Sequence, residues 1–145
     1  MLFRSVNDMP ELKYDRANPG PCCQKIDDMI QYARPIIARW PAFHKYTLGE
    51  DIMQEMYTML RLATKARLRY MNKSTLADLD TSKAVLDVFI QQANKVIFTD
   101  RNGRERRLLT DQSFGVWSAK VAEIGALIGG WMASVSDRKS SDQRR

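Results

Sequence analysis

The chain has 145 residues, 44% of them hydrophobic, which is enough to bury the core of a single domain. Its formal net charge of +6, from 23 basic and 17 acidic residues, favours an anionic partner, with solvated basic faces as the alternative. The only two cysteines, Cys22 and Cys23, are adjacent, which excludes a disulfide-stabilised fold and favours a cytoplasmic protein.

Residues 1–21 show no sustained helical period and no apolar core typical of a secretory signal, so they predict an extended N-terminal segment. From Cys22 to Trp40, apolar residues recur at three- and four-residue spacing, which predicts an amphipathic helix. Pro35 should kink or interrupt this helix, and Pro41 should end it. The apolar face consists of Ile26, Met29, Ile30, Ala33, Ile36, Ile37 and Trp40.

Thr47-Leu48-Gly49-Glu50 has the pattern of a capping box, which predicts that a second helix begins here and runs to about Met71. The break at Asn72–Ser74 is short, as between antiparallel neighbours in a bundle. Ser74 or Thr75 can cap a third helix, which we expect to end near Phe98. The apolar positions of these two helices are Ile52, Met56, Met59, Leu60, Ala63, Tyr70, Leu79, Val85, Leu86, Val88, Phe89, Ala93, Val96 and Ile97.

Residues 99–110 are polar and loop-like, with a turn signal at Asn102-Gly103, and Thr110 or Asp111 can cap a fourth helix that fades at Asp137. Its apolar positions are Phe114, Trp117, Val121, Ile124, Leu127, Ile128, Trp131 and Val135. Lys120 and Glu123 interrupt this apolar stretch, so it predicts a buried helix and no membrane span.

No alternation typical of strands competes with the helical periods. The sequence therefore predicts an all-α fold, an antiparallel up-down-up-down four-helix bundle over residues 22–136. Residues 137–145 are predicted to form a basic flexible tail, in which Arg138, Lys139, Arg144 and Arg145 are either anion contacts or solvated charges.

The sequence shows no grouping typical of a catalytic site, a metal site or a cofactor site, so we expect a protein that is not an enzyme. His44, the only histidine, falls in a predicted surface loop without further zinc ligands. Cys22 has no base near it in the sequence, so we expect an inert or buried thiol. Gly129-Gly130 lacks the lysine and hydroxyl pair of a phosphate-binding loop. The remaining candidates are the carboxylate pairs Asp27-Asp28 and Glu50-Asp51.

These carboxylates are expected to interact with the positive N-termini of helices. A metal- or ligand-binding bundle that uses them is the alternative.

Clusters of basic residues are the more informative feature. Arg61, Lys65 and Arg69 recur every four residues, opposite Ile52 on the predicted helix. Like charges at this spacing destabilise an isolated helix, and binding a phosphate backbone would compensate for that cost. Arginine suits phosphate because its planar fork donates two hydrogen bonds. The predicted contacts are Arg61, Lys65, Arg67, Arg69, Lys73, Arg101, Arg104, Arg106 and Arg107.

Glycines in the fourth predicted helix indicate close packing, because each costs about 1 kcal/mol relative to alanine. Gly125, Gly129 and Gly130 would let another helix approach closely, either within the bundle or between subunits. Trp131 beside them is expected to be a core or interface anchor, as are Trp40 and Trp117.

Three segments carry a family resemblance: Tyr32-Ala33-Arg34-Pro35-Ile36 ahead of Trp40-Pro41, then His44-Lys45-Tyr46-Thr47-Leu48-Gly49-Glu50-Asp51-Ile52, and finally Glu123-Ile124-Gly125-Ala126-Leu127-Ile128-Gly129-Gly130-Trp131-Met132. The first two resemble the four-helix-bundle family related to proteins encoded in 23S rRNA intervening sequences. The last resembles one branch of it, the accessory variability determinants of diversity-generating retroelements. The resemblance covers about residues 24–135.

Proteins of that branch are non-enzymatic, barrel-shaped homopentamers of four-helix bundles that bind a reverse transcriptase and its template RNA and support mutagenic cDNA synthesis. For this chain the resemblance implies a homopentamer, with a reverse transcriptase, template-repeat RNA and structured noncoding RNA as partners. The predicted basic contacts would then face RNA or the polymerase. The alternative is an intervening-sequence-type protein with a structural or RNA-binding role and no reverse-transcriptase partner.

Overall fold

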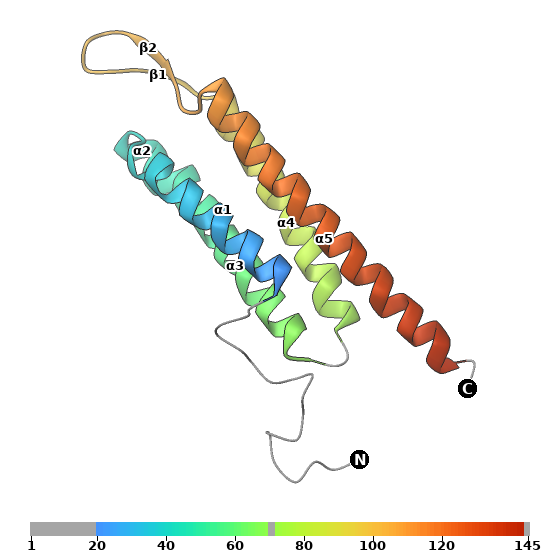
Figure 1. The fold of residues 1–145 in the computed structure, drawn as a ribbon. Coiled ribbons are helices and arrows are strands. Elements are labelled where there is room, and N and C mark those ends of the chain that lie inside the picture. Colours follow the sequence, from blue (N-terminus) through green and yellow to red (C-terminus); the bar gives the residue numbers. More distant parts are fainter. Residues whose placement is uncertain (1–19, 70–71, 144–145) are drawn as a thin grey trace.

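The computed structural model describes residues 20–69 and 72–143, with side chains as far as residue 136. Within this part of the chain, four long helices form the predicted antiparallel bundle: α1 (Pro21–Ala38), α3 (Glu50–Arg67), α4 (Lys73–Asn94) and α5 (Asp111–Gln143). Each packs against two others, in the cyclic order α1, α3, α4, α5 (Figure 1). The up-down-up-down topology is therefore confirmed.

The core forms along the apolar stripes that the helical period predicts. Trp117 of α5 is fully buried, together with Ile26 and Met29 of α1, Met56 of α3 and Leu86 of α4. Burying such side chains contributes about 1.5–3 kcal/mol each, which is the main force holding the bundle together.

The start of α1 is favoured by Gly20 and Pro21. Gly20 has a φ of 94°, a value that glycine adopts readily, and Pro21 occupies the first helical turn, where its missing N–H is not needed. The helix continues through Pro35 to Ala38, so the expected break does not occur. Pro35 and Gln31, whose carbonyl loses its donor, both lie on the exposed side of the helix, where water can replace that donor.

The predicted capping box at Thr47 is wrong, because the chain is already helical there. The short α2 (Ala42–His44) passes directly into a π-helical turn, η2 (Lys45–Gly49), and then into α3. The Thr47 hydroxyl donates to the Phe43 carbonyl, 2.6 Å away, instead of capping a helix start. Gly49 is buried here, and a Cβ on it would lie 2.9 Å from Ile37 Cγ2 and 3.4 Å from Trp40 Cε3. Close packing of this turn on α1 therefore favours glycine.

The connection from α3 to α4 is tied by Asn72, which is buried and whose side-chain amide donates to the Ala66 carbonyl across 3.0 Å. α3 ends at Arg67, earlier than the predicted end near Met71. Tyr70 and Met71 lie outside the described residues. α4 begins at Lys73, after the N-cap residue Asn72.

α4 ends at Asn94, and a β-hairpin follows in place of the predicted helix end and loop. Strands β1 (Ile97–Thr99) and β2 (Glu105–Arg107) pair antiparallel, with Phe98 opposite Arg106. The turn falls at Asn102-Gly103 as predicted, and Gly103 has a φ of 77°. The hairpin projects from the end of the bundle at which α1 ends and α5 begins (Figure 1).

α5 begins as predicted, because the Thr110 hydroxyl accepts the Ser113 amide across 3.0 Å, a regular N-cap. The expected end at Asp137 is wrong, since the helix continues to Gln143. The predicted basic tail is therefore helical over its first residues. Within the described residues, no helix combines the length and the apolar character needed to cross a bilayer.

Candidate nucleic-acid interface

The hairpin turn is organised by one carboxylate. Asp100 Oδ1 accepts the backbone amides of Asn102 and Arg104, at 2.9 and 3.0 Å, and its Oδ2 accepts Arg106 Nε at 2.7 Å. The pKa of Asp100 lies below its ordinary value, mainly because of the hydrogen bond from the Arg104 backbone N–H and next because of the one from the Arg106 guanidinium. Two of the predicted contact residues are thus tied to an acidic residue at the base of the turn.

Of the four arginines in this segment, two have an acidic partner and two do not. Arg107 is paired, because its guanidinium donates to Asp111 at 2.5 Å and to Asn94 Oδ1 at 2.9 Å. Arg106 is paired with Asp100. Arg101 and Arg104 are exposed and have no ion pair with any described residue. The structured turn therefore presents two unneutralised guanidinium groups to solvent.

The second predicted cluster lies at the opposite end of the bundle. Arg61 and Lys65 are exposed on α3, and Lys73 is exposed at the start of α4. Arg69 is exposed too, but it follows the end of α3, so the predicted helical stripe is only two residues long. α3 has 18 residues and spans about 27 Å, so the structure does not bring this cluster and the hairpin arginines together.

Arg67 differs from the other predicted contacts. It is half-buried, and its guanidinium lies so close to Gly20 that a Cβ there would be 2.2 Å from its Nη1. It also faces the Cys23 thiol, whose pKa it tends to lower. The position of Arg67 between α3 and the start of α1 indicates a structural role.

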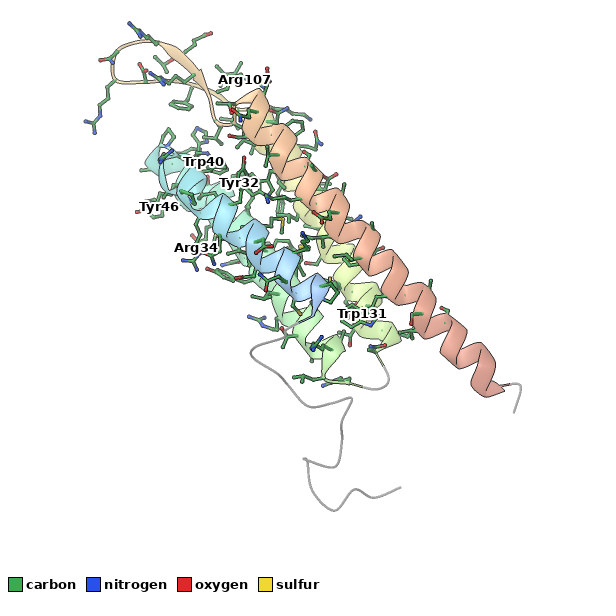
Figure 2. All side chains as sticks on the ribbon, viewed as in Figure 1. Tyr32, Arg34, Trp40, Tyr46, Arg107 and Trp131 are labelled. Atoms are coloured by element: carbon green, nitrogen blue, oxygen red, sulfur yellow. The ribbon has the colours of Figure 1, made fainter. Side chains whose placement is uncertain are left out.

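The sequence predictions missed an aromatic surface beside the hairpin. Phe43 in α2 and Tyr46 in η2 are 72% and 66% exposed, and Ile97 in β1 is 63% exposed. These are the three most exposed large hydrophobic side chains of the described residues, and all lie at the hairpin end. Figure 2 shows Tyr46 at this end, with Trp131 toward the other. The Phe43-His44-Lys45-Tyr46 segment, two aromatic residues flanking two basic ones, was the available signal.

His44 links this aromatic surface to the hairpin. Its ring lies 5.2 Å from that of Phe43, nearly perpendicular to it, and 6.3 Å from that of Phe98 in β1, measured between centroids. The prediction of a surface-loop histidine is wrong, since His44 is half-buried in α2.

The candidate chemical groups are not assembled into a reactive site in the described part of the chain. Asp27 and Asp28 accept hydrogen bonds from Gln31 and Gln24, one turn away on α1. They lie outside the first turn of α1, so the predicted interaction with a helix N-terminus is wrong for this pair. Glu50 and Asp51 do lie in the first turn of α3, which continues the helical run that starts at Ala42.

Within residues 20–69 and 72–136, no group of three His, Cys, Asp or Glu side chains is placed to hold a metal ion. Cys22 and Cys23 are buried free thiols. The pKa of Cys22 is raised to about 12, mainly by burial and to a smaller extent by the neighbouring Cys23.

The three glycines of α5 face different surroundings. A Cβ on Gly125 would lie 3.2 Å from Cδ of Lys83 on α4, whereas Gly129 and Gly130 are exposed with open space around them. Packing inside the bundle therefore does not explain Gly129 and Gly130. Trp131 is half-buried and packs on the core, as the prediction of a core or interface anchor allows.

A comparison with protein families identifies the family of the chain. The model of the bAvd-like family matches residues 22–135, the greater part of the chain. The chain belongs to the bAvd-like family. This match confirms the resemblance to accessory variability determinants, and no curated protein sequence matches the chain.

The bAvd-like match extends over the hairpin and the aromatic surface as well as α3, α4 and most of α1 and α5. Accessory variability determinants are a family of accessory, non-catalytic proteins, so membership of the bAvd-like family places the chain in an accessory protein family.

Proposed function

We propose that this bAvd-like protein is an accessory factor of a diversity-generating retroelement, which binds the reverse transcriptase and the template RNA and supports mutagenic cDNA synthesis. The observation that carries this proposal is the family match over residues 22–135. The accessory role requires surfaces for partners and no reactive centre of its own.

The hairpin supports an RNA-binding role on electrostatic grounds. Arg101 and Arg104 are exposed, lack an acidic partner among the described residues, and sit on a turn fixed by Asp100. The turn fixes the backbone that carries both arginines, so less conformational entropy is lost when their guanidinium groups bind phosphate, and phosphate contacts supply most of the sequence-independent affinity for nucleic acid. This turn is the better supported RNA contact.

The cluster at the opposite end, made of Arg61, Lys65, Arg69 and Lys73, is proposed as the second contact surface, for the polymerase or for another part of the RNA. Its separation from the hairpin by the length of α3 lets two partners bind without competing. Exposed charged clusters of this kind increase the rate of association more than they increase affinity.

Self-association as a homopentamer is part of the proposal. Support comes from Gly129 and Gly130, two exposed positions of α5 at which an added Cβ would meet nothing within the protomer. Small residues let helices of neighbouring subunits approach closely, which offsets the helix propensity they cost.

The decisive experiment is purification of the tagged full-length chain at moderate salt from its native host, with identification of the protein and RNA that accompany it. A reverse transcriptase together with a structured noncoding RNA is the expected result. Recovery of ribosomal RNA fragments alone, or of no specific partner, would overturn the proposal and favour an intervening-sequence-type role.

Two double variants then distinguish the surfaces. Arg101→Glu with Arg104→Glu alters the hairpin, and Lys65→Glu with Arg69→Glu alters the opposite end. Each changes the net charge by the same amount, so each is the matched control for the other. We expect the first pair to weaken RNA binding more strongly, with helicity by circular dichroism unchanged. Equal losses would show that only total charge matters.

A further inference from the structure

The aromatic surface at the hairpin end has the geometry of a platform on which flat ligands stack. Phe43 contacts His44 nearly edge-to-face, at an interplanar angle of 83°, and is 72% exposed, so at least one face of its ring is open to solvent. Tyr46 carries the Lys45 ammonium 5.5 Å from its ring centroid and is 66% exposed. Two exposed rings therefore lie in one short segment, and a cation lies over one of them.

The backbone beneath the rings is held firmly. The Lys45 amide donates to the Pro41 carbonyl across 2.9 Å, and the Thr47 hydroxyl donates to the Phe43 carbonyl. The buried Gly49 then fits the π-helical turn against Ile37 and Trp40. π-Helical turns occur frequently at functional sites, and a platform that is already rigid loses little entropy on binding.

We propose that Phe43 and Tyr46 stack on unpaired bases of single-stranded RNA, while Lys45, Arg101 and Arg104 hold the adjoining phosphates. This inference rests on the proposed function and adds the class of RNA that the hairpin end selects. His44 and Phe98 connect the two halves of the site, because their rings join α2 to the strand that leads into the turn.

The composition of the surface favours RNA over a protein partner. Protein interfaces are depleted of charge at their buried centre, and here the exposed rings lie at the same end of the bundle as Lys45, Arg101 and Arg104, cations without an acidic partner in the described part of the chain. A nucleotide combines an aromatic face with a phosphate, so it matches both components at once. Paired bases in a duplex keep their faces covered and can meet only the cations.

The test compares a fluorescent single-stranded RNA of mixed sequence with the same sequence as a duplex, using the full-length chain. Phe43→Ala and Tyr46→Ala should each weaken single-strand binding at least about fivefold, since stacking on one aromatic side chain contributes about 1–3 kcal/mol. Duplex binding should change by less than about twofold. Val88→Ala, which removes an exposed apolar side chain from α4, is the matched control and should change neither.

A second readout detects stacking itself. A single strand containing 2-aminopurine should lose fluorescence on binding the wild-type chain, and this quenching should disappear in Phe43→Ala with Tyr46→Ala and return in Phe43→Trp with Tyr46→Trp. Both positions are exposed, so the variants should keep their helicity.

Failure of this inference is distinguishable from failure of the proposed function. Wild-type-like single-strand affinity and quenching in the double alanine variant would overturn the stacking platform while leaving RNA binding intact. Unchanged RNA binding together with loss of a co-purifying protein would make the surface a protein interface, and would overturn the platform as well. If the wild-type chain binds neither RNA, the proposed function itself fails.

Discussion

Arg106 Nε lies 2.7 Å from Asp100 Oδ2, and this contact joins β2 to the residue at which the hairpin turn begins. The same carboxylate accepts the amide of Arg104 on its other oxygen. The turn that presents the exposed arginines therefore depends on the ionised form of one side chain.

The hairpin should be insensitive to pH until strongly acidic conditions. The pKa of Asp100 lies below its ordinary value of 3.8, so its stabilising contribution is fully present above that value and is lost as the pH falls through the lower folded value. In an NMR titration, we expect the amide signals of Asn102 and Arg104 to stay constant from pH 8 to about pH 5 and to shift only below about pH 3.8.

Arg106→Gln should move that titration midpoint upward toward the ordinary value, because one of the two main donors to the carboxylate loses its charge. Arg101→Gln, which alters an arginine with no contact to Asp100, is the control. A wild-type midpoint at or above the ordinary value would contradict the observed hydrogen bonds.

Gly49→Ala should destabilise the bundle by about 1–3 kcal/mol, because the new Cβ would press on the side chain of Ile37 and on the His44 carbonyl, 2.9 and 3.3 Å away. Gly115→Ala on α5 is the matched control, since its Cβ would meet open space and should stabilise the helix by up to about 1 kcal/mol. Urea denaturation followed by circular dichroism measures both. A Gly49→Ala variant as stable as the wild-type protein would show that the π-helical turn accommodates the added methyl group.

The thiol of Cys22 should be unreactive in the folded protein. With a pKa of about 12, only about 10⁻⁴ of it is ionised at pH 8, and the thiolate is the reactive form. Burial raises the pKa of Cys23 as well. Iodoacetamide should therefore label neither cysteine at pH 8 without denaturant and both in concentrated urea, as measured by mass spectrometry. Rapid labelling of the native protein would indicate that the start of α1 opens readily.

The double variant Gly129→Ala with Gly130→Ala tests whether these glycines matter within the protomer or between subunits. In an isolated protomer both changes are tolerated and should raise stability by up to about 1 kcal/mol each, because each Cβ has open space. If neighbouring subunits approach closely here, as proposed, the added methyl groups should shift the assembly toward smaller species in native mass spectrometry. Gln91→Ala, on the exposed side of α4, is the control. An unchanged assembly would remove these glycines from the interface.

The sequence was sufficient to predict the four long helices, because their apolar residues follow a strict helical period. It failed at Thr47, where the local pattern of a capping box is overridden by the packing of Gly49 on Trp40 and Ile37. It also failed at Ile97, whose spacing continues the period of α4. That strand is stabilised by contacts with residues further along the chain, such as the bond from the Leu108 amide to the Val96 carbonyl.

The sequence was sufficient to select the basic residues of the candidate interface, but it did not show which of them lie together on one surface. Charge and spacing identified Arg61 and Arg104 equally well, and only the topology shows that they lie at opposite ends of the bundle. Arg67 illustrates the converse, since a helical wheel cannot show that the start of α1 covers it. The aromatic surface was missed because exposure of Phe43 and Tyr46 depends on where α2 and η2 lie in the fold.

The length of α3 sets a minimum size for any RNA that touches both basic surfaces. Its 18 residues span about 27 Å, which corresponds to about eight nucleotides at the rise of about 3.4 Å in one strand of B-form DNA, and to fewer in a more extended single strand. Shorter oligonucleotides can occupy one end at a time, and longer ones can bridge both from a single molecule. Affinity should therefore rise in a step, not smoothly, as the RNA is lengthened past this span, because the second contact then forms at a high effective concentration.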